Sequence, residues 1–240
     1  MKIDNIRLKP GESENKLLDI ASRKLHAAAH IQIIKKSLDA RDKSDIHWVY
    51  TIEADRKPIV LQERTWRQVR RHPRRVIVVG SGPAGLFCAI RLIRAGIRPV
   101  IVERGGTVEE RAAQNDRFFN EHILDADCNV QFGEGGAGTF SDGKLNTQTK
   151  DLRNREVLET FVQFGAPQEI AYLNKPHIGS DRLRTVLVNM RKFIYAFGGE
   201  FLFHTRLEDG RMADGAPRSV LLRAVRSGVA RVEEPSELVL

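Results

Sequence analysis

Apolar and polar positions along the first 55 residues predict a small α+β module. An apolar run over residues 3–8 predicts a strand, and Pro10-Gly11 predicts the turn that follows it. Two further β-prone runs, residues 31–34 and 46–52, flank a charged link at residues 39–45. A helix is predicted between the first strand and these runs, and Ser13 would cap it. Four apolar residues with helical spacing share one face of this helix: Leu17, Leu18, Ala21 and Leu25. The predicted order is β-α-β-β.

A second pattern begins at Val76, where a β-branched run enters a glycine-rich turn. Residues 76–79 read VIVV and residues 80–85 read GSGPAG, a G-x-G-x-x-G turn that opens a helical pattern over residues 83–95 and ends at Gly96. In such a unit Gly80 permits the tight turn, Gly82 lets the backbone approach a pyrophosphate, and Gly85 allows close packing of helix and sheet. Ser81, Pro83 and Ala84 belong to the same candidate site. The turn predicts a dinucleotide-binding site.

An acidic residue follows the next buried run at the spacing that this site requires. Residues 99–102 read PVIV, and Glu103 comes 18 residues after Gly85. A carboxylate at this place can accept hydrogen bonds from both hydroxyls of an adenosine ribose and disfavours a 2′-phosphate. FAD or NAD therefore fits better than NADP, and a tight turn with a chance acid is the structural alternative.

Beyond this acid, residues 107–120 are polar and compatible with a helix. Arg104 and Arg111 are placed to reach a phosphate or a carboxylate if the chain folds back over a nucleotide, and exposure to solvent is the alternative. Five glycines then stand between Gly133 and Gly143, interleaved with Phe132, Phe140 and Leu145. Ordering so many glycines costs entropy, so we expect this backbone to approach something flat or anionic closely. A flexible loop is the alternative.

The next patterns predict a helix and a third parallel strand. Residues 182–197 carry an apolar stripe, with Ser180 or Asp181 as the cap and Gly198-Gly199 as the end, and residues 200–207 read as the strand. Lone histidines are mostly structural. His177 nevertheless precedes the helix and lies near the glycine-rich segment in sequence, which makes it the best candidate for a proton donor or substrate contact.

The net charge of +8 is unevenly distributed. Residues 1–75 hold 18 Lys and Arg against 10 Asp and Glu, and residues 63–75 alone hold six arginines, of which Arg64, Arg67 and Arg71 have helical spacing. The change in charge composition just before Val76 predicts a basic module at 1–62, a basic linker at 63–75 and the dinucleotide domain at 76–240. Basic stretches with an aromatic residue also bind RNA, so residues 1–75 are a candidate nucleic-acid contact, although a solvated linker or surface helix accounts for the charge.

Composition sets further expectations. Cys88 and Cys128 lie 40 residues apart, a spacing that predicts neither a C-x-x-C motif nor a metal site. Cys88 is expected to be a small buried thiol, and Cys128 a packing residue with a catalytic thiol as the alternative. The chain has no apolar run of 18 residues and its first residues are unlike a signal peptide, which predicts a cytoplasmic protein without a membrane partner.

Three segments resemble a known family: VIVVGSGPAGLFCAIRL, NVQFGEGGAGTFSDGKLNTQ and NKPHIGSDRL. From Val76 to about Leu207 the chain is similar to the bacterial FAD-dependent dehydrogenases, or NAD(FAD)-utilizing dehydrogenases, of the glutathione-reductase-like flavoprotein class. The N-terminal module with IIKKSLDARDK also looks like the leading domain of that family. The resemblance implies an α/β fold with a Rossmann-like FAD-binding domain built on a parallel sheet, preceded by the βαββ module.

The resemblance also implies roles for individual residues. Gly80, Gly82, Gly85 and Glu103 would hold the ADP half of FAD. Five residues of the glycine-rich segment would lie along the pyrophosphate and the flavin, namely Gly135, Gly136, Ala137, Gly138 and Thr139. The strand near Leu207 would contact adenine. The family resemblance names FAD and a reaction class, but no substrate.

Family members are longer, so the resemblance implies a C-terminally truncated chain in which residues 220–225 and 235–240 correspond to a β-hairpin and a further parallel strand. The favoured function is an FAD-dependent oxidoreductase or dehydrogenase, with hydride transfer at flavin N5 and NAD(P)H as a candidate electron donor. The alternatives are a flavin-dependent RNA-modifying or RNA-binding protein that uses the basic module, and a non-catalytic nucleotide-binding remnant.

Overall fold

The computed structural model describes the chain except residues 60–65, 71, 72, 142, 146–148, 150 and 152. It divides into two compact units, residues 1–63 with 144–178 (unit 1) and residues 64–143 with 179–240 (unit 2). Arg64 and Arg71 of the predicted basic helix face lie outside the described residues. Arg67 is described and lies in an irregular segment.

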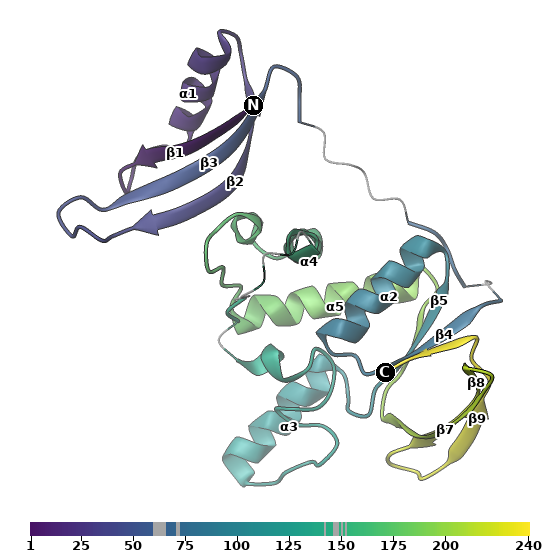
Figure 1. Cartoon of the computed structure of the whole chain (residues 1–240). Helices are drawn as coiled ribbons and strands as arrows, with labels where there is room; N and C mark the ends of the chain where they lie inside the picture. Colours follow the sequence, from purple (N-terminus) through teal and green to yellow (C-terminus); the bar gives the residue numbers. More distant parts are fainter. Residues whose placement is uncertain (60–65, 71–72, 142, 146–148, 150, 152) are drawn as a thin grey trace. The chain divides into compact units, whose positions relative to one another are not determined.

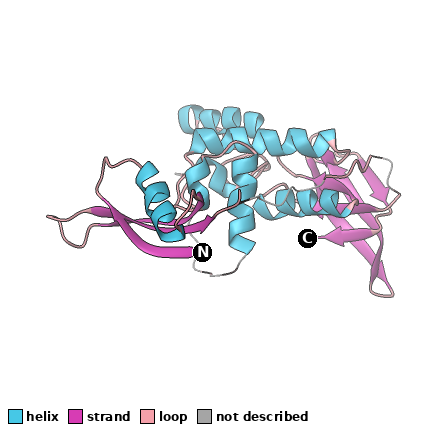
Figure 2. Cartoon of the chain, turned by 90° about the horizontal axis from the view of Figure 1, so that it is seen from above, coloured by secondary structure: helices cyan, strands magenta, loops and turns pink. Residues whose placement is uncertain are grey.

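Unit 1 begins with the expected βαββ module (Figures 1 and 2). Its elements are β1 (Lys2–Leu8), α1 (Asn15–Leu25), β2 (His30–Asp39) and β3 (His47–Asp55). The antiparallel sheet has the order β1-β3-β2, and α1 packs on it through Leu17 and Ala21. Leu18, expected on the same face, is 40% exposed. Ser13 does not occupy the cap position, which is Glu14, although its Oγ accepts a hydrogen bond from the backbone N of Asn15.

The division of the chain differs from the predicted boundaries 1–62, 63–75 and 76–240. The segment with α4 (Arg153–Gln163) and the short helix η2 (Gln168–Ala171) groups with the N-terminal module. Its backbone pairs with β2, since Lys36 N donates to Tyr172 O and Asn174 N donates to Lys36 O. Part of the predicted linker groups with unit 2 because Val69 N donates to Phe197 O and Trp66 packs edge-on against Phe193.

Unit 2 is built on a four-stranded parallel sheet with the order β10-β4-β5-β6, of which Figure 1 labels β4 and β5. Its strands are β4 (Arg75–Val79), β5 (Arg98–Val102), β6 (Glu200–Leu202) and β10 (Glu237–Val239). Helix α2 (Pro83–Ala95) links β4 to β5 over the predicted residues and ends at Gly96, whose φ is 78°. The expected parallel strand near the C-terminus is present as β10, beside β4.

Two layers cover this parallel sheet. Helices α2 and α5 (Ser180–Ala196) are in contact with each other, and Val78 of β4 faces α2 close to Gly85. On the other face lies the antiparallel sheet of β7 (Thr205–Ala213), β8 (Ala216–Ala224) and β9 (Ala230–Glu233). Residues of β4, β5 and β8 form the core between the two sheets: Ile77, Val100, Val102, Val220 and Leu222.

Two predicted elements differ in detail. The strand expected over residues 200–207 is divided between β6 and β7, because His204 has a φ of 50° and turns the chain from one sheet to the other. Helix α5 begins at Ser180 after Gly179, with no side-chain cap. Neither Ser180 nor Asp181 therefore caps it.

Candidate functional site

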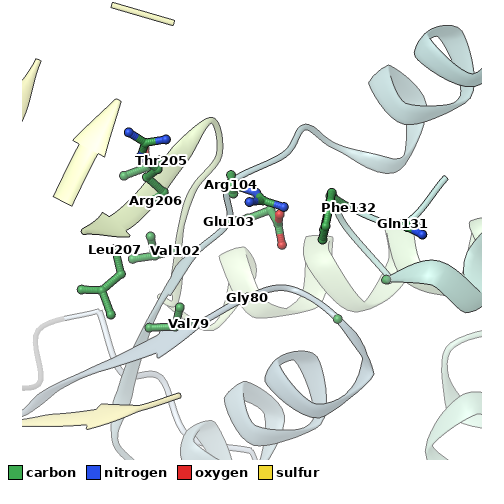
Figure 3. Close-up of a pocket in the computed structure, with 13 residues that line it drawn as sticks. Val79, Gly80, Val102, Glu103, Arg104, Gln131, Phe132, Thr205, Arg206 and Leu207 are labelled. Atoms are coloured by element: carbon green, nitrogen blue, oxygen red, sulfur yellow. The ribbon is translucent and has the colours of Figure 1, made fainter. Parts of the chain in front are cut away.

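A cavity of about 390 Å³ opens at the carboxyl ends of β4 and β5, where α/β folds bind ligands (Figure 3). Three groups of residues line it. They are the strand ends and glycine turn (Val79, Gly80, Gly82, Val102, Glu103, Arg104), the start of the glycine-rich segment (Gln131, Phe132, Gly133, Gly136) and the start of β7 (Thr205, Arg206, Leu207).

The glycine turn leaves open space where side chains would stand. Gly80 has a φ of 93°, and a Cβ built on Gly80 or Gly82 meets no atom within 4 Å. A Cβ on Gly85, by contrast, would collide with the carbonyl oxygen of Gly80. Gly82 and Pro83 begin α2, so the helix N-terminus with its unpaired N–H groups opens at the cavity. The turn thus has open space at Gly80 and Gly82 and needs close packing at Gly85, while access for a ligand at the turn stays a prediction.

Glu103 ties the end of β5 to the glycine turn. Its Oε2 accepts hydrogen bonds from Ser81 N at 2.8 Å and Ser81 Oγ at 2.7 Å, and its Oε1 accepts one from Gly105 N at 2.7 Å. The residue is only 6% exposed, yet it lines the cavity. Figure 3 shows its carboxylate beside Arg104. The carboxylate is therefore fixed before a ligand binds.

Arg104 and Phe132 form a stacked pair on the cavity wall. The Arg104 guanidinium carbon lies 3.9 Å from the centre of the Phe132 ring, and Arg104 Nε lies 3.4 Å from Asp127 Oδ1. Phe132 is 41% exposed. A flat aromatic face and a cation at the mouth of the cavity suit a nucleotide base and its phosphates.

Arg111 lies elsewhere than expected. Its side chain is fully buried, does not line the cavity, and donates to carbonyl oxygens of residues 129–136. Burial lowers the pKa of its guanidinium, against the influence of Cys128, Glu103 and Glu134. The expectation that Arg111 reaches outward to a phosphate is corrected, because these backbone partners occupy its N–H groups.

The glycine-rich segment meets the glycine turn through its backbone. Gly135 N donates to Ser81 O at 2.8 Å, and a Cβ on Gly136 would lie 3.3 Å from Pro83 Cδ. Of the five segment residues predicted to follow the cofactor, only Gly136 lines the cavity. Gly135, Ala137, Gly138 and Thr139 do not.

Glu134, in this segment, is a buried acid that the sequence did not single out. Its Oε2 accepts from Val108 N at 2.8 Å and pairs with Arg191 Nη1 at 2.9 Å, while its Oε1 has no hydrogen-bond partner. Burial raises its pKa to about 7 despite Val108 N and Arg191, and the acids Glu109 and Glu103 raise it further. The start of α3 (Val108–Glu121) is thereby tied to α5.

The other predicted residues divide as follows. Gly80, Gly82, Glu103, Arg104, Gly136 and Leu207 line the cavity, whereas Ser81, Pro83, Ala84 and Gly85 form the turn behind it. His177 is exposed, belongs to unit 1 and is not among the lining residues.

Sequence reasoning missed Gln131, Phe132, Gly133, Thr205 and Arg206 as lining residues. Phe132 carried a signal, since an aromatic residue directly before five glycines is unusual in a flexible loop. Thr205 and Arg206 carried none, because the break at His204 that brings them to the cavity has no sequence marker.

The two cysteines lie in different surroundings. Cys128 is buried, burial raises the pKa of its thiol, and its Sγ accepts a hydrogen bond from Gly106 N. Cys88 is only partly buried. Among the described residues no cluster of three metal-ligating side chains occurs, and none of the helices described is both long and apolar enough to cross a bilayer.

Comparison with known families matches two parts of the chain. Residues 74–116 match the model described as an FAD binding domain, and residues 1–55 match a domain of unknown function, DUF8436. The first match covers the glycine turn, Glu103 and Arg111, and it confirms the prediction of FAD as the cofactor. The glutathione-reductase-like dehydrogenase family named from the sequence stays a prediction.

One relative aligns over most of the chain. An uncharacterized protein of Clostridium beijerinckii is 37% identical over 243 residues, which cover 92% of this chain and 46% of the relative. The chain thus spans about half the length of the curated relative that it matches.

Two solved structures are also similar. THI4 of Thermovibrio ammonificans matches with 18% identity and a TM-score of 0.43, over 69% of this chain and 55% of that one. The glycerol-3-phosphate dehydrogenase of Bacillus halodurans complexed with FAD matches with 16% identity and a TM-score of 0.35, over 71% and 34%. TM-scores below 0.5 do not establish a common fold.

Proposed function

We propose that unit 2 binds FAD in the cavity at the ends of β4 and β5 and that the chain contributes this site to a flavin-dependent oxidoreductase. The observation that carries the proposal is the union of the glycine turn, Glu103 and the glycine-rich segment around one cavity. The family match over residues 74–116 supports the choice of cofactor.

The residues present fit the ADP half of FAD. The open space at Gly80 and Gly82 admits a pyrophosphate against the start of α2. Glu103 Oε1 accepts one hydrogen bond, from Gly105 N, and a carboxylate oxygen can accept two, so it retains capacity for a ribose hydroxyl. Phe132 and Leu207 offer apolar surface to adenine on opposite sides of the cavity (Figure 3).

Each of these residues has a separate task. Glu103 orients the ribose, Arg104 supplies a cation near the phosphates, and the burial of β4 and β5 beneath the cavity excludes water from one side. When bound, FAD supplies a hydride acceptor at flavin N5. We propose NAD(P)H as the electron donor. The proposal does not specify the chemical class of the substrate.

The test is the absorbance of the purified chain between about 300 and 550 nm, before and after addition of FAD and gel filtration. Flavin bands that persist support the site, and their bleaching by NADH or NADPH without oxygen supports the oxidoreductase. A chain that stays colourless after incubation with FAD would contradict the proposal. Retention of FAD without bleaching would leave the site intact and reject these donors.

A further inference from the structure

Arg111 lies directly behind the part of the glycine-rich segment that borders the cavity. Its guanidinium makes five hydrogen bonds to four backbone carbonyl oxygens, those of Asn129, Val130, Glu134 and Gly136, at distances of up to 3.1 Å. The same guanidinium lies 4.9 Å from the centre of the Phe140 ring. Its planar group is thus enclosed by one continuous segment.

A side chain at Gly133 would not fit beside Arg111. Gly133 has a φ of 116°, and a Cβ there would collide with Arg111 Cδ. The start of α3 holds Arg111 in place through a capping box, in which Thr107 and Glu110 bond to each other's backbone N–H groups. Arg111 N donates to Thr107 O at 2.9 Å, in the first turn of the same helix.

Holding the carbonyl oxygens fixes the N–H groups as well. A trans peptide is planar, with its C=O and N–H directed to opposite sides. Because Arg111 holds the carbonyls of Glu134 and Gly136, the N–H groups of Gly135 and Ala137 point away from it. Gly135 bears this out, since its N–H reaches Ser81 O in the glycine turn. The N–H of Ala137 follows Gly136, which borders the cavity.

We propose that Arg111 is a positioning residue: by holding the carbonyls of Glu134 and Gly136 it turns the backbone N–H of Ala137 toward the diphosphate of the bound nucleotide, while the N–H of Gly135 ties the segment to Ser81. A backbone N–H directed at an anion attracts it without a side-chain cation at the surface. The proposal rests on the proposed function, and it replaces the direct phosphate contact expected for this residue with an indirect one.

The test compares ADP with adenosine as probes, by isothermal titration of the full chain. Arg111→Met removes the hydrogen bonds, and Arg111→Lys keeps the charge but presents one ammonium group to four carbonyls. We expect both variants to lose about 10-fold to 100-fold in ADP affinity, since hydrogen bonds to charged groups have this magnitude. Adenosine affinity should change by less than about twofold.

Arg117→Met on the same helix is the matched control, because Arg117 pairs with Glu121 at the surface, away from the glycine-rich segment. It should leave both affinities unchanged. Circular dichroism identifies folded variants, and if Arg111→Met fails to fold, Arg111→Lys carries the test. In that variant, hydrogen exchange should also quicken at residues 129–137 relative to wild type.

Two outcomes overturn the inference while the proposed function stands: an equal loss of ADP and adenosine affinity, and full ADP affinity in Arg111→Lys, which would mean that charge alone matters. A wild-type chain that binds neither FAD nor ADP overturns the proposed function and this inference with it.

Discussion

The carboxylate of Glu103 accepts hydrogen bonds from both the backbone N–H and the hydroxyl of Ser81, at 2.8 and 2.7 Å. An acid at the end of β5 thereby holds the glycine turn after β4 in shape. The residue expected to meet a ribose is therefore also a structural part of the turn that we expect to meet the phosphates.

Glu103→Gln should destabilise unit 2 by about 1–2 kcal/mol, because a neutral amide accepts these hydrogen bonds less strongly and brings an NH₂ group near their donors. Retention of FAD after gel filtration should fall as well. Urea unfolding followed by circular dichroism measures the first effect. Glu121→Gln, at the exposed end of α3, is the control. Equal stability of the Glu103 variant and wild type would argue against this dual role.

Gly85→Ala and Gly82→Ala should separate folding from binding. The first substitution forces a Cβ against the Gly80 carbonyl oxygen, so we expect a loss of about 2 kcal/mol or more in the free energy of unfolding. The second places its methyl group in open space beside the cavity, so the chain should fold normally and retain less FAD. Thermal unfolding and flavin absorbance distinguish the two, and a reversal of these effects would show that we have misassigned the glycines.

Glu134 should make the stability of unit 2 depend on pH. Its pKa of about 7 in the folded chain exceeds the ordinary value of 4.5, so the folded state binds more protons between these values. Its contribution is therefore fully present below about pH 4.5 and is lost as the pH rises toward about 7, by up to about 3 kcal/mol.

Glu134→Gln should remove this dependence, as measured by urea unfolding at several pH values over that interval. Glu121→Gln, which changes an exposed acid at the end of the same helix α3, should keep the slope. If the free energies of unfolding of wild type and the Glu134 variant change with pH in parallel, burial does not raise the pKa of the Glu134 carboxyl group.

Thr107→Ala should destabilise the start of α3 by about 1 kcal/mol, because it removes the hydroxyl that accepts from Glu110 N. Thr107→Ser keeps the hydroxyl and should recover most of the loss. A melting temperature that is the same for the alanine and serine variants would contradict a working capping box.

Lys36→Met tests the polar cluster of unit 1. Lys36 Nζ lies 2.6 Å from Glu14 Oε1 and over the ring of Trp48, at 4.8 Å from its centre. Burial opposes ionisation of Glu14, but Lys36 and Tyr50 outweigh it and lower the pKa of that carboxyl. We expect Lys36→Met to lower the free energy of unfolding by about 1 kcal/mol, and this loss should shrink as the pH falls below about 4.5. The Trp48 fluorescence should shift as well.

Lys16→Met is the matched control for this pair, because Lys16 and Glu12 form a surface ion pair on the same module. It should change neither stability nor fluorescence measurably. If the Lys36 variant has the same stability and fluorescence as the Lys16 variant, the polar cluster around Lys36 does not stabilise unit 1.

The sequence predicts best what short stretches of chain determine by themselves. The unit of β4, α2 and β5 lies where its periodicity and glycines place it, because strand, turn and helix are neighbours in sequence. The same local pattern predicts a dinucleotide, FAD or NAD, and the family resemblance names FAD. A further parallel strand at residues 235–240 was predicted from family resemblance, since a three-residue strand carries little signal of its own, and the structure places this strand, β10, beside β4.

Long-range contacts account for most of the differences. Periodicity does not reveal that His204 adopts a left-handed conformation, so the strand over 200–207 was predicted as continuous. Nor does it reveal whether an arginine is exposed: Arg111 is buried because carbonyl oxygens from residues 129–136 surround it. The grouping of residues 144–178 with the N-terminal module depends on pairing between Lys36 and Tyr172.

The strand order of the parallel sheet constrains how the chain acquires its structure during synthesis. β4, α2 and β5 are contiguous and can assemble as soon as they leave the ribosome, whereas Ser236, which bonds to Arg75, follows it by 161 residues. Closing such a loop is entropically costly and slow. One edge of β4 therefore stays unpaired while the residues around the cavity are translated, so the nascent chain has its glycine turn before it has a complete sheet.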